Sequence, residues 1–271
     1  MSMKIGLAST LHSLIRLLRG RPQAPASLAD NALLKVILNR RSVRQFSDRE
    51  IPDDILAAIL EAGRLAPSTV NLQTWSFAVF TAERWRQVFG QSIPFRGNRA
   101  VIVIGDTFRA RQVLDVFPYS PLIEYTVAVM NASLAAMNMN IAAEALGVSS
   151  VMLSETGRSG LLDTRYLAEK LALPEGTYPL LTLVLGYARG PYPPMPPKLP
   201  AQQIFFTGAY GSPDRAILQD WLAQMIAGYK ASHPLSSFER QVQVYRSKIG
   251  QAEADLRKRV FYRGDYPQPG H

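Results

Sequence analysis

The chain has 271 residues, of which 47% are hydrophobic and 19% charged, a composition that predicts a folded domain with a sizeable core and excludes bulk disorder. It has no cysteine and three histidines, so disulfides, thiolate catalysis and cysteine-ligated metals are excluded, and no metal site or Ser-His-Asp triad is predicted. The net charge of +9 suits a phosphate-bearing small molecule, whereas the scattering of the basic residues argues against a nucleic-acid partner. If the protein is an enzyme, we expect a cofactor to carry its chemistry.

Residues 1–27 are predicted to form an amphipathic extension followed by a linker. Leucine and isoleucine recur at helical spacing over residues 7–18, and residues 20–27 are rich in proline, glycine and alanine. This pattern favours a helix packed on its own domain or on a partner subunit over contact of residues 1–20 with an anionic membrane surface. No apolar run is long enough to predict a membrane span, and we expect a cytoplasmic protein.

The next part of the chain mixes predicted helices and strands. One helix starts near Ser27 and Asp30 and ends before residue 40, and a second starts at Pro52 and ends before Pro67. The apolar runs predict strands over residues 74–81, 99–106, 149–153 and 178–188, with a short helix around residues 166–171. Residues 121–147 predict a long helix that is apolar on almost every face, and such a helix must be buried centrally or in a subunit interface.

After Gly190 the composition changes. Residues 190–200 contain too much proline for a helix or a central strand, which predicts an extended arm. Residues 214–260 then carry two helical stretches, each with an apolar stripe. We therefore expect three parts: an N-terminal extension and linker (1–27), a core (28–205) and a C-terminal helical extension (206–271).

Three arginines and two serines stand in residues 38–47, LNRRSVRQFS. Guanidinium groups match phosphate oxygens bidentately, and a serine hydroxyl adds a short hydrogen bond. Alternate residues of an extended segment share a face, so Arg40, Ser42 and Arg44 are predicted to hold one phosphate while Arg41 points elsewhere. A solvated basic surface after a helix would show the same pattern.

Residues 65–75, LAPSTVNLQTW, predict a polar turn at the mouth of a strand. Asn71 and Gln73 each bring a donor and an acceptor, which suits the edge of a heteroaromatic ring with carbonyl and N–H groups, such as a flavin. An ordinary polar loop between a helix and a strand would look alike. No G-x-G-x-x-G follows a strand and no P-loop is present, so a Rossmann dinucleotide site and a P-loop nucleotide site are not indicated.

Taken together, RRSVRQF and APSTVNLQTW resemble the FMN-dependent nitroreductase family, whose members show R-x-S-x-R-x-F followed by A-P-S-x-x-N-x-Q-x-W. NMNIAAEALGVSSVML is similar to the family's central helix and flavin-edge strand, and KLALPEGTYPLLTLVLGYA to its last core strand. The resemblance covers roughly residues 35–200. It implies an α+β fold, a three-layer α/β/α sandwich with a central mixed, mainly antiparallel sheet, in an interlocked homodimer; the helical extensions at both ends are additional.

The resemblance also implies which residues bind FMN. The phosphate and ribityl contacts match Arg40, Arg41, Ser42 and Arg44. The turn that meets the isoalloxazine from the neighbouring subunit matches Pro67, Ser68, Thr69, Asn71 and Gln73. Ser154 and Glu155 follow the flavin-edge strand, within LSETG where many relatives have a glycine pair or Glu-Gly. Lys198 falls where the family places a basic residue near the phosphate, although the family commonly has two in this arm.

The implied activity is hydride transfer from NADPH or NADH, through flavin N5, to a nitroaromatic, a quinone or a similar small electrophile in two half-reactions (ping-pong). FMN carries the chemistry, no catalytic side chain is implied, and an arginine of the cluster or Lys198 is expected to stabilise the reduced flavin. The loop 107–124 is the candidate substrate-pocket wall, through Phe117, Tyr119 and Tyr125; ordinary packing is the alternative reading of these aromatic residues.

Two other functions remain open at this point. A specialised enzyme on the same fold, such as a dehalogenase, a ring or azoline oxidase or a flavin-fragmenting enzyme, would use residues 206–271 to cover or reshape the pocket. A non-enzymatic basic module would bind a membrane or nucleic acid through the N-terminal segment and Arg257–Arg259.

Overall fold

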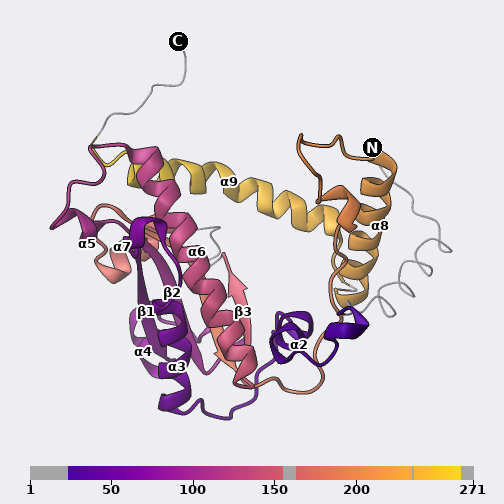
Figure 1. Cartoon of the computed structure of the whole chain (residues 1–271). Helices are drawn as coiled ribbons and strands as arrows, with labels where there is room; N and C mark the ends of the chain where they lie inside the picture. The colour runs from indigo at the N-terminus through magenta and orange to yellow at the C-terminus, as the bar shows by residue number, and fades with distance from the viewer. Residues whose placement is uncertain (1–23, 155–162, 234, 264–271) are drawn as a thin grey trace. The chain divides into compact units, whose positions relative to one another are not determined.

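The computed structural model describes residues 24–154, 163–233 and 235–263 (Figure 1). These residues form two compact units, and the division falls within the last helix. The larger unit consists of Asp30–Tyr192 together with the described chain from Lys248 on. The smaller unit consists of Pro193–Ser247 together with the described residues up to Ala29.

The larger unit is built on a four-stranded antiparallel sheet in the order β1-β2-β4-β3. Its strands are β1 (Trp75–Thr81), β2 (Arg99–Asp106), β3 (Ser149–Leu153) and β4 (Thr177–Gly186). β2 is buried along nearly its whole length, which explains its unbroken apolar run. The four predicted strands are confirmed, with bounds that differ by at most two residues from the expected ones.

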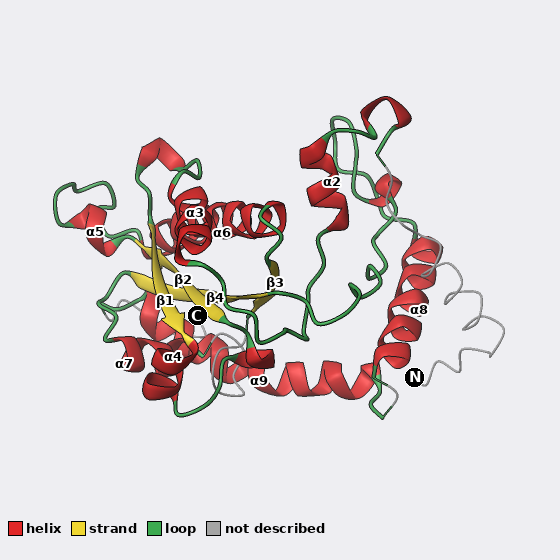
Figure 2. Ribbon diagram, turned by 90° about the horizontal axis from the view of Figure 1, so that it is seen from below, coloured by secondary structure: helices red, strands yellow, loops and turns green. Residues whose placement is uncertain are grey.

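Helices cover both faces of this sheet (Figure 2). α3 (Asp53–Arg64) and α6 (Pro121–Ala145) lie on one face, and α4 (Ala82–Phe89) and α7 (Thr164–Leu171) on the other. Successive strand residues point to opposite faces, so Leu183 and Leu185 pack in the cluster below α3 and α6, while Val184 packs with Trp85 of α4. Two separate hydrophobic clusters result, and the predicted three-layer α+β architecture is confirmed.

Two local features differ from the sequence-based expectations. The first helix, α2 (Ala32–Asn39), begins later than predicted, because Asn31 caps it by accepting a hydrogen bond from the Leu34 N–H at 3.0 Å. α4 was not expected at all. Thr81 caps it through the Arg84 N–H at 3.1 Å, and only three of its apolar side chains face the sheet, a weak periodic signal in eight residues.

α6 packs on the sheet through small side chains. The buried face is formed mainly by alanines with Met139, and the opposite face exposes large apolar side chains: Leu122, Ile123, Met130, Leu134 and Met137. Within the described chain, therefore, only one face of this all-apolar helix is covered.

The C-terminal helix α9 (Phe238–Val260) ends on the core of the larger unit. Val260 is buried against Tyr178 and Ala128. Arg259 donates hydrogen bonds to the carbonyls of Leu173 and Thr177, both at 2.8 Å, and to that of Pro174. These bonds pair carbonyls of the segment that leads into β4, so the last turn of α9 acts as its cap.

The smaller unit holds the proline-rich arm and α8 (Arg215–Ser232). The arm has no strand and no helix until the short 3-10 turn Ala201–Gln203, in agreement with the predicted extended segment. Asp214 caps α8 by accepting from the Ala216 N–H at 2.8 Å, and Trp221 donates to the Pro197 carbonyl at 3.4 Å. Within the described ranges, no helix has the length and hydropathy needed to cross a membrane.

The cap formed by Arg259 gives a stability prediction. Replacing Arg259 by alanine leaves partly buried carbonyls without a donor, and we expect the free energy of unfolding to fall by about 2–3 kcal/mol. Arg257→Ala is the matched control, since Arg257 is half-exposed and, among the residues that the structure describes, pairs with Glu253 alone, one turn away; we expect a loss of about 0.5 kcal/mol or less. Urea unfolding of both variants measures the difference, and equal losses would contradict the capping role.

Candidate functional site

The arginine cluster begins at the C-terminal end of α2, where Arg40 is the capping residue. Arg41 turns back to this helix end, and its Nη1 donates to the carbonyls of Leu38 at 2.8 Å and of Arg40 at 2.9 Å. A guanidinium is favourable here because it pairs the last helix carbonyls and opposes the negative end of the helix dipole. Arg41 is thus directed to the helix, as the alternation of side chains predicts.

The following segment runs along the β3 edge of the sheet. Ser42 bridges Ser150 in parallel, with the Val43 N–H donating to the Ser150 carbonyl at 2.9 Å, and Phe46 bridges Ala188. Val43 and Phe46 are buried and hold the segment to the core. Arg44 is exposed, and in the described part of the chain neither the Arg40 guanidinium nor the Ser42 hydroxyl has a hydrogen-bonding partner. Cationic and hydroxyl donors beside a fixed backbone suit an anion such as phosphate.

A polar network lies next to this segment. The Ser150 hydroxyl donates to Asn140 Oδ1 at 2.5 Å. The Tyr192 hydroxyl lies 2.9 Å from Ser149 Oγ and donates to Glu144 Oε2 at 3.3 Å. Burial raises the pKa of Glu144, while the hydrogen bond from Tyr192 and the charges of Arg40 and Arg41 act in the opposite direction. The sequence analysis missed this network, although Asn140 and Glu144, two of the polar residues of a mostly apolar helix, were a signal for it.

The predicted polar turn precedes β1 and is fixed by one buried amide. Asn131 of α6 accepts from the Thr69 N–H at 3.1 Å and from its hydroxyl at 3.2 Å, and donates to Thr74 Oγ1 at 2.8 Å. The Ser68 hydroxyl accepts from the Gln73 N–H at 3.0 Å. Asn131 and Thr74 are buried, and neither was singled out from the sequence.

The backbone of this turn is strained. Val70, Asn71 and Gln73 have φ values of 49°, 56° and 48°, a left-handed conformation that is unfavourable for side chains other than glycine and most of all for a β-branched one. The bonds from Asn131 and Ser68 hold the turn in this state. Asn71 and Gln73 consequently present their amides to the surface, and Pro67 is exposed beside them.

One chain does not bring the turn and the arginine cluster together. The turn lies at the corner of the sheet where Trp75 pairs with Gly105. The cluster pairs with Ser150 of β3. Across the sheet, Ser150 is in register with Thr81, which lies at the other end of β1. The two corners are separated by six residues along the strands, roughly 20 Å, and by three strand spacings, roughly 14 Å. They are diagonal corners of the same sheet.

Three predicted residues remain. Ser154 is exposed directly after β3, four residues beyond Ser150 on the same edge, a separation of roughly 13 Å. Glu155 lies outside the described residues. Lys198 is exposed and belongs to the smaller unit. The cluster and Ser154 therefore share the β3 edge.

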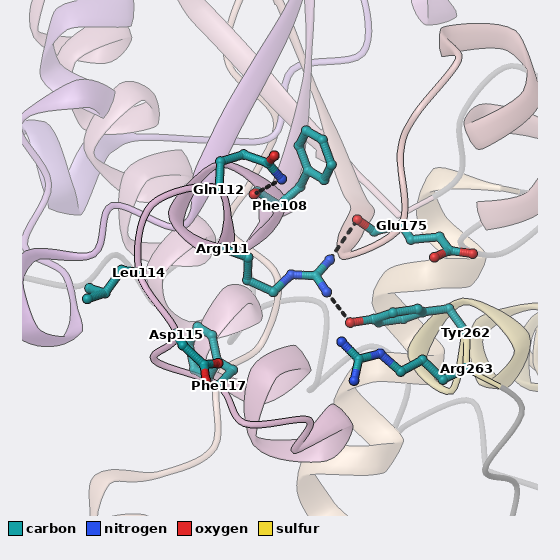
Figure 3. A pocket seen from close by; sticks show the side chains of 9 residues that line it. All are labelled: Phe108, Arg111, Gln112, Leu114, Asp115, Phe117, Glu175, Tyr262 and Arg263. Atoms are coloured by element: carbon teal, nitrogen blue, oxygen red, sulfur yellow. Dashed lines mark hydrogen bonds between the residues drawn. The ribbon is translucent and has the colours of Figure 1, made fainter.

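An open hollow of about 480 Å³ lies between the loop after β2 and the end of α9 (Figure 3). Phe108 and Arg111, which bound the short helix α5 (Phe108–Arg111), and Phe117 line one side, and Tyr262 and Arg263 the other. Tyr119 lies beside it, with its ring centroid 5.8 Å from that of Tyr262. Tyr125 instead packs edge-on against Tyr178 in the core, at 5.1 Å. Two of the three predicted pocket aromatics thus gather at the hollow.

A buried ion pair fixes the back of this hollow. Glu124 is fully buried, lies 3.3 Å from Arg111 Nε and accepts from the Thr107 hydroxyl. Arg111 also donates to the Glu175 carbonyl at 2.9 Å and to the Tyr262 hydroxyl. Thr107 follows Asp106, whose N–H donates to the Thr74 carbonyl at 3.0 Å, so the hollow adjoins the corner that carries the turn.

Known proteins share this fold and these motifs. Residues 37–187, more than half of the chain, match the Nitroreductase family. A protein of Archaeoglobus fulgidus provisionally named NADH dehydrogenase/NAD(P)H nitroreductase is 33% identical over 162 residues, covering 58% of this chain and 85% of its own. The FMN reductase (NADPH) of Bacillus subtilis is 27% identical over 191 residues, covering 66% of this chain and 75% of its own.

The fold is found in solved structures as well. The NADPH:FMN oxidoreductase of Vibrio harveyi, solved with NAD+, aligns with a TM-score of 0.66 at 23% identity over 80% of this chain and 92% of its own. The family match covers both predicted motifs and all four strands of the sheet, and it replaces the hypothesis of a non-enzymatic basic module. The chain belongs to the nitroreductase family and is an oxidoreductase.

Proposed function

We propose that the protein is a homodimeric, FMN-dependent NAD(P)H oxidoreductase that reduces nitroaromatics, quinones or similar small electrophiles. The observation that carries the proposal is the arginine and serine cluster along the β3 edge, within the part of the chain that matches the family. The names of two relatives, FMN reductase (NADPH) and NADPH-flavin oxidoreductase, support a flavin cofactor and a nicotinamide donor. The chemistry supplied by bound FMN is hydride transfer between a reduced nicotinamide and the acceptor.

The β3 edge fits an elongated phosphate-bearing cofactor. Arg40, Ser42 and Arg44 offer donors to a phosphate at one end of the edge, and Ser154 lies roughly 13 Å further along the strand. The protein then binds and orients the cofactor and needs no acid or base of its own. Arg40 and Arg44 raise the local positive potential, which favours an anionic reduced ring. The family resemblance adds Glu155 and Lys198 to this proposed binding set.

A second copy of the chain supplies the other half of the site. The strained turn at the diagonal corner presents its amides outward and cannot serve the cluster of its own chain. In a two-fold dimer each turn, with Pro67, Ser68, Thr69, Asn71 and Gln73, meets the cofactor held by the partner's cluster. The exposed apolar face of α6 supports such an interface, because water would otherwise contact five large apolar side chains on one helix.

The hollow beside the turn supports a place for the acceptor. Phe108, Phe117 and Tyr262 offer apolar and aromatic surface, and the Arg111–Glu124 pair holds the wall in place. Tyr262 and Arg263, in the turn that follows α9, build part of this wall, so the C-terminal extension shapes the pocket. That observation favours, as a second candidate, a specialised flavoenzyme on this fold whose acceptor is selected by the extension.

The proposal is tested by the absorption spectrum of the purified protein under anaerobic titration. We expect flavin bands that bleach with NADPH or NADH and return when a nitroaromatic or a quinone is added. Bound flavin that no nicotinamide reduces would favour the specialised enzyme. A colourless protein that does not take up added FMN would refute the flavoprotein proposal.

Replacing Arg40 by alanine tests the phosphate contact. Loss of a charge-assisted hydrogen bond should weaken FMN binding about tenfold or more, while binding of riboflavin, which lacks the phosphate, should stay unchanged. Quenching of flavin fluorescence measures both affinities. Arg165→Ala on α7 is the control, because Arg165 is exposed and pairs with Glu169; it should change neither. Equal weakening of both flavins by Arg40→Ala would contradict a phosphate contact.

Leu134→Asp tests the proposed dimer interface. Leu134 is 45% exposed on the uncovered face of α6, and a carboxylate buried there in a dimer would be strongly destabilising. We expect the molar mass from light scattering to fall to that of one chain and FMN to be lost with it. Val79→Asp is matched in exposure, at 40%, but lies on edge strand β1 and should stay dimeric. A dimeric, flavin-binding Leu134→Asp variant would contradict the interface.

A further inference from the structure

Glu144 is the only charged residue of α6 after Glu124, and it lies beside the proposed phosphate site. It stands in the last turn of the helix and is half-buried. The Tyr192 hydroxyl donates to its Oε2 at 3.3 Å and is itself held by Ser149 at 2.9 Å. Ser149 adjoins Ser150, the residue that bridges Ser42. The carboxyl is therefore linked, through the Tyr192 hydroxyl and Ser149, to the strand residue next to the one that bridges the cluster.

The charges around Glu144 come from few elements. Arg40 and Arg41 face it from the segment after α2, and Tyr192 from the start of the arm. β3 contributes hydroxyls only, through Ser149 and Ser150. Burial is the largest influence and raises the pKa of the carboxyl, whereas the Tyr192 hydrogen bond and the two arginines lower it. Within the described chain no ion pair joins Glu144 to Arg40, so this guanidinium is left for an external anion.

A phosphate that binds at this cluster changes the balance of influences on the pKa of Glu144. The positive charges of Arg40 and Arg41 then act on the phosphate as well as on the Glu144 carboxylate, and a second negative group stands near the same arginines. Like charges favour the neutral form of a carboxyl group, and a partly buried one responds more strongly because solvent screens it less. The charge that a phosphate brings is about −1.5 to −2 at neutral pH.

We propose that Glu144 takes up a proton when a phosphate monoester binds at the Arg40–Ser42–Arg44 cluster, so that this side chain makes cofactor affinity depend on pH. The inference rests on the proposed function, because FMN is the ligand that brings the phosphate. Glu144 is a specificity-determining residue in this scheme: it discriminates between ligands by their charge at the phosphate position. Tyr192 is a positioning residue that stabilises the charged carboxylate.

The test compares wild type with Glu144→Gln, in which the side chain is permanently neutral. Dissociation constants for FMN and riboflavin are measured by fluorescence quenching from about pH 5 to about pH 8, a range that spans a raised carboxyl pKa. For FMN we expect the ratio of the wild-type constant to the Glu144→Gln constant to be near one at the acid end. It should rise about fivefold towards the alkaline end, where the wild-type carboxylate is charged.

The comparison isolates Glu144 from other titrations. The phosphate group has its own second pKa of about 6, but its titration occurs with both proteins, so the ratio keeps only the part of the pH dependence that comes from Glu144. For riboflavin the ratio should stay flat over the whole range. Glu61→Gln on α3 removes an exposed carboxylate that pairs with Arg64 and should reproduce wild type throughout.

Tyr192→Phe gives an independent readout. Removing the hydroxyl takes away a hydrogen bond to the charged carboxylate, so the fall in FMN affinity should keep its size but move to higher pH. The inference would be overturned if the ratio of the wild-type to the Glu144→Gln dissociation constant for FMN did not change with pH. It would also be overturned if the same ratio for riboflavin changed in the same way as that for FMN. Either result would leave the flavoprotein proposal intact. Failure of the wild-type protein to bind either flavin at any pH would overturn both.

Discussion

The close contact between α6 and the sheet is the constraint on which the rest of the molecule depends. Alanines form most of the buried helix face, and a Cβ added at Gly105 of β2 would lie only 3.0 Å from Ala128. At this separation the few polar residues of α6 reach the structures at its two ends. Asn131 holds the strained turn, Asn140 bonds β3, and Glu124 anchors the wall of the hollow. A larger side chain in the alanine face would displace all three together.

The arrangement separates the two halves of the proposed binding site within a chain. The turn and the cluster occupy diagonal corners of a sheet that is rigid because its two central strands are buried. A cofactor that uses both halves therefore depends on association, and binding and assembly become thermodynamically linked. The strain stored at Val70, Asn71 and Gln73 fits this view, since a turn that must meet a ligand on another chain is better held in its final shape beforehand.

Much of the fold was predictable from the sequence, because strong local signals coincide with the real elements. The apolar run of β2, the acidic first turn of α3 and the glycine after α6 each mark a boundary that the structure confirms. α4 was not predicted, because eight residues with three inward apolar side chains give little periodicity. The predicted start of α2 was wrong, because the capping residue is Asn31 and not a residue closer to Ser27.

The candidate site was predictable only where its residues are close together in sequence. The cluster and the turn form contiguous motifs, whereas the residues that support them come from elsewhere: Asn131 lies 57 positions from Thr74, and Tyr192 lies 48 from Glu144. Tyr262 reaches Arg111 across 151 positions. In the sequence, the signal of such a long-range contact is weak: a polar residue within a mostly apolar helix. That signal does not indicate which residue the polar side chain contacts.

The cap provided by Arg259 has a consequence for biosynthesis. The carbonyls that it pairs belong to residues 173–177, yet Arg259 is translated after the whole arm and α8. At 5–20 residues per second the ribosome needs on the order of ten seconds to make the intervening chain. During that interval β4 is already synthesised but its leading segment has no donor from α9. The nascent core reaches its final structure at this end of the sheet only after α9 has been synthesised.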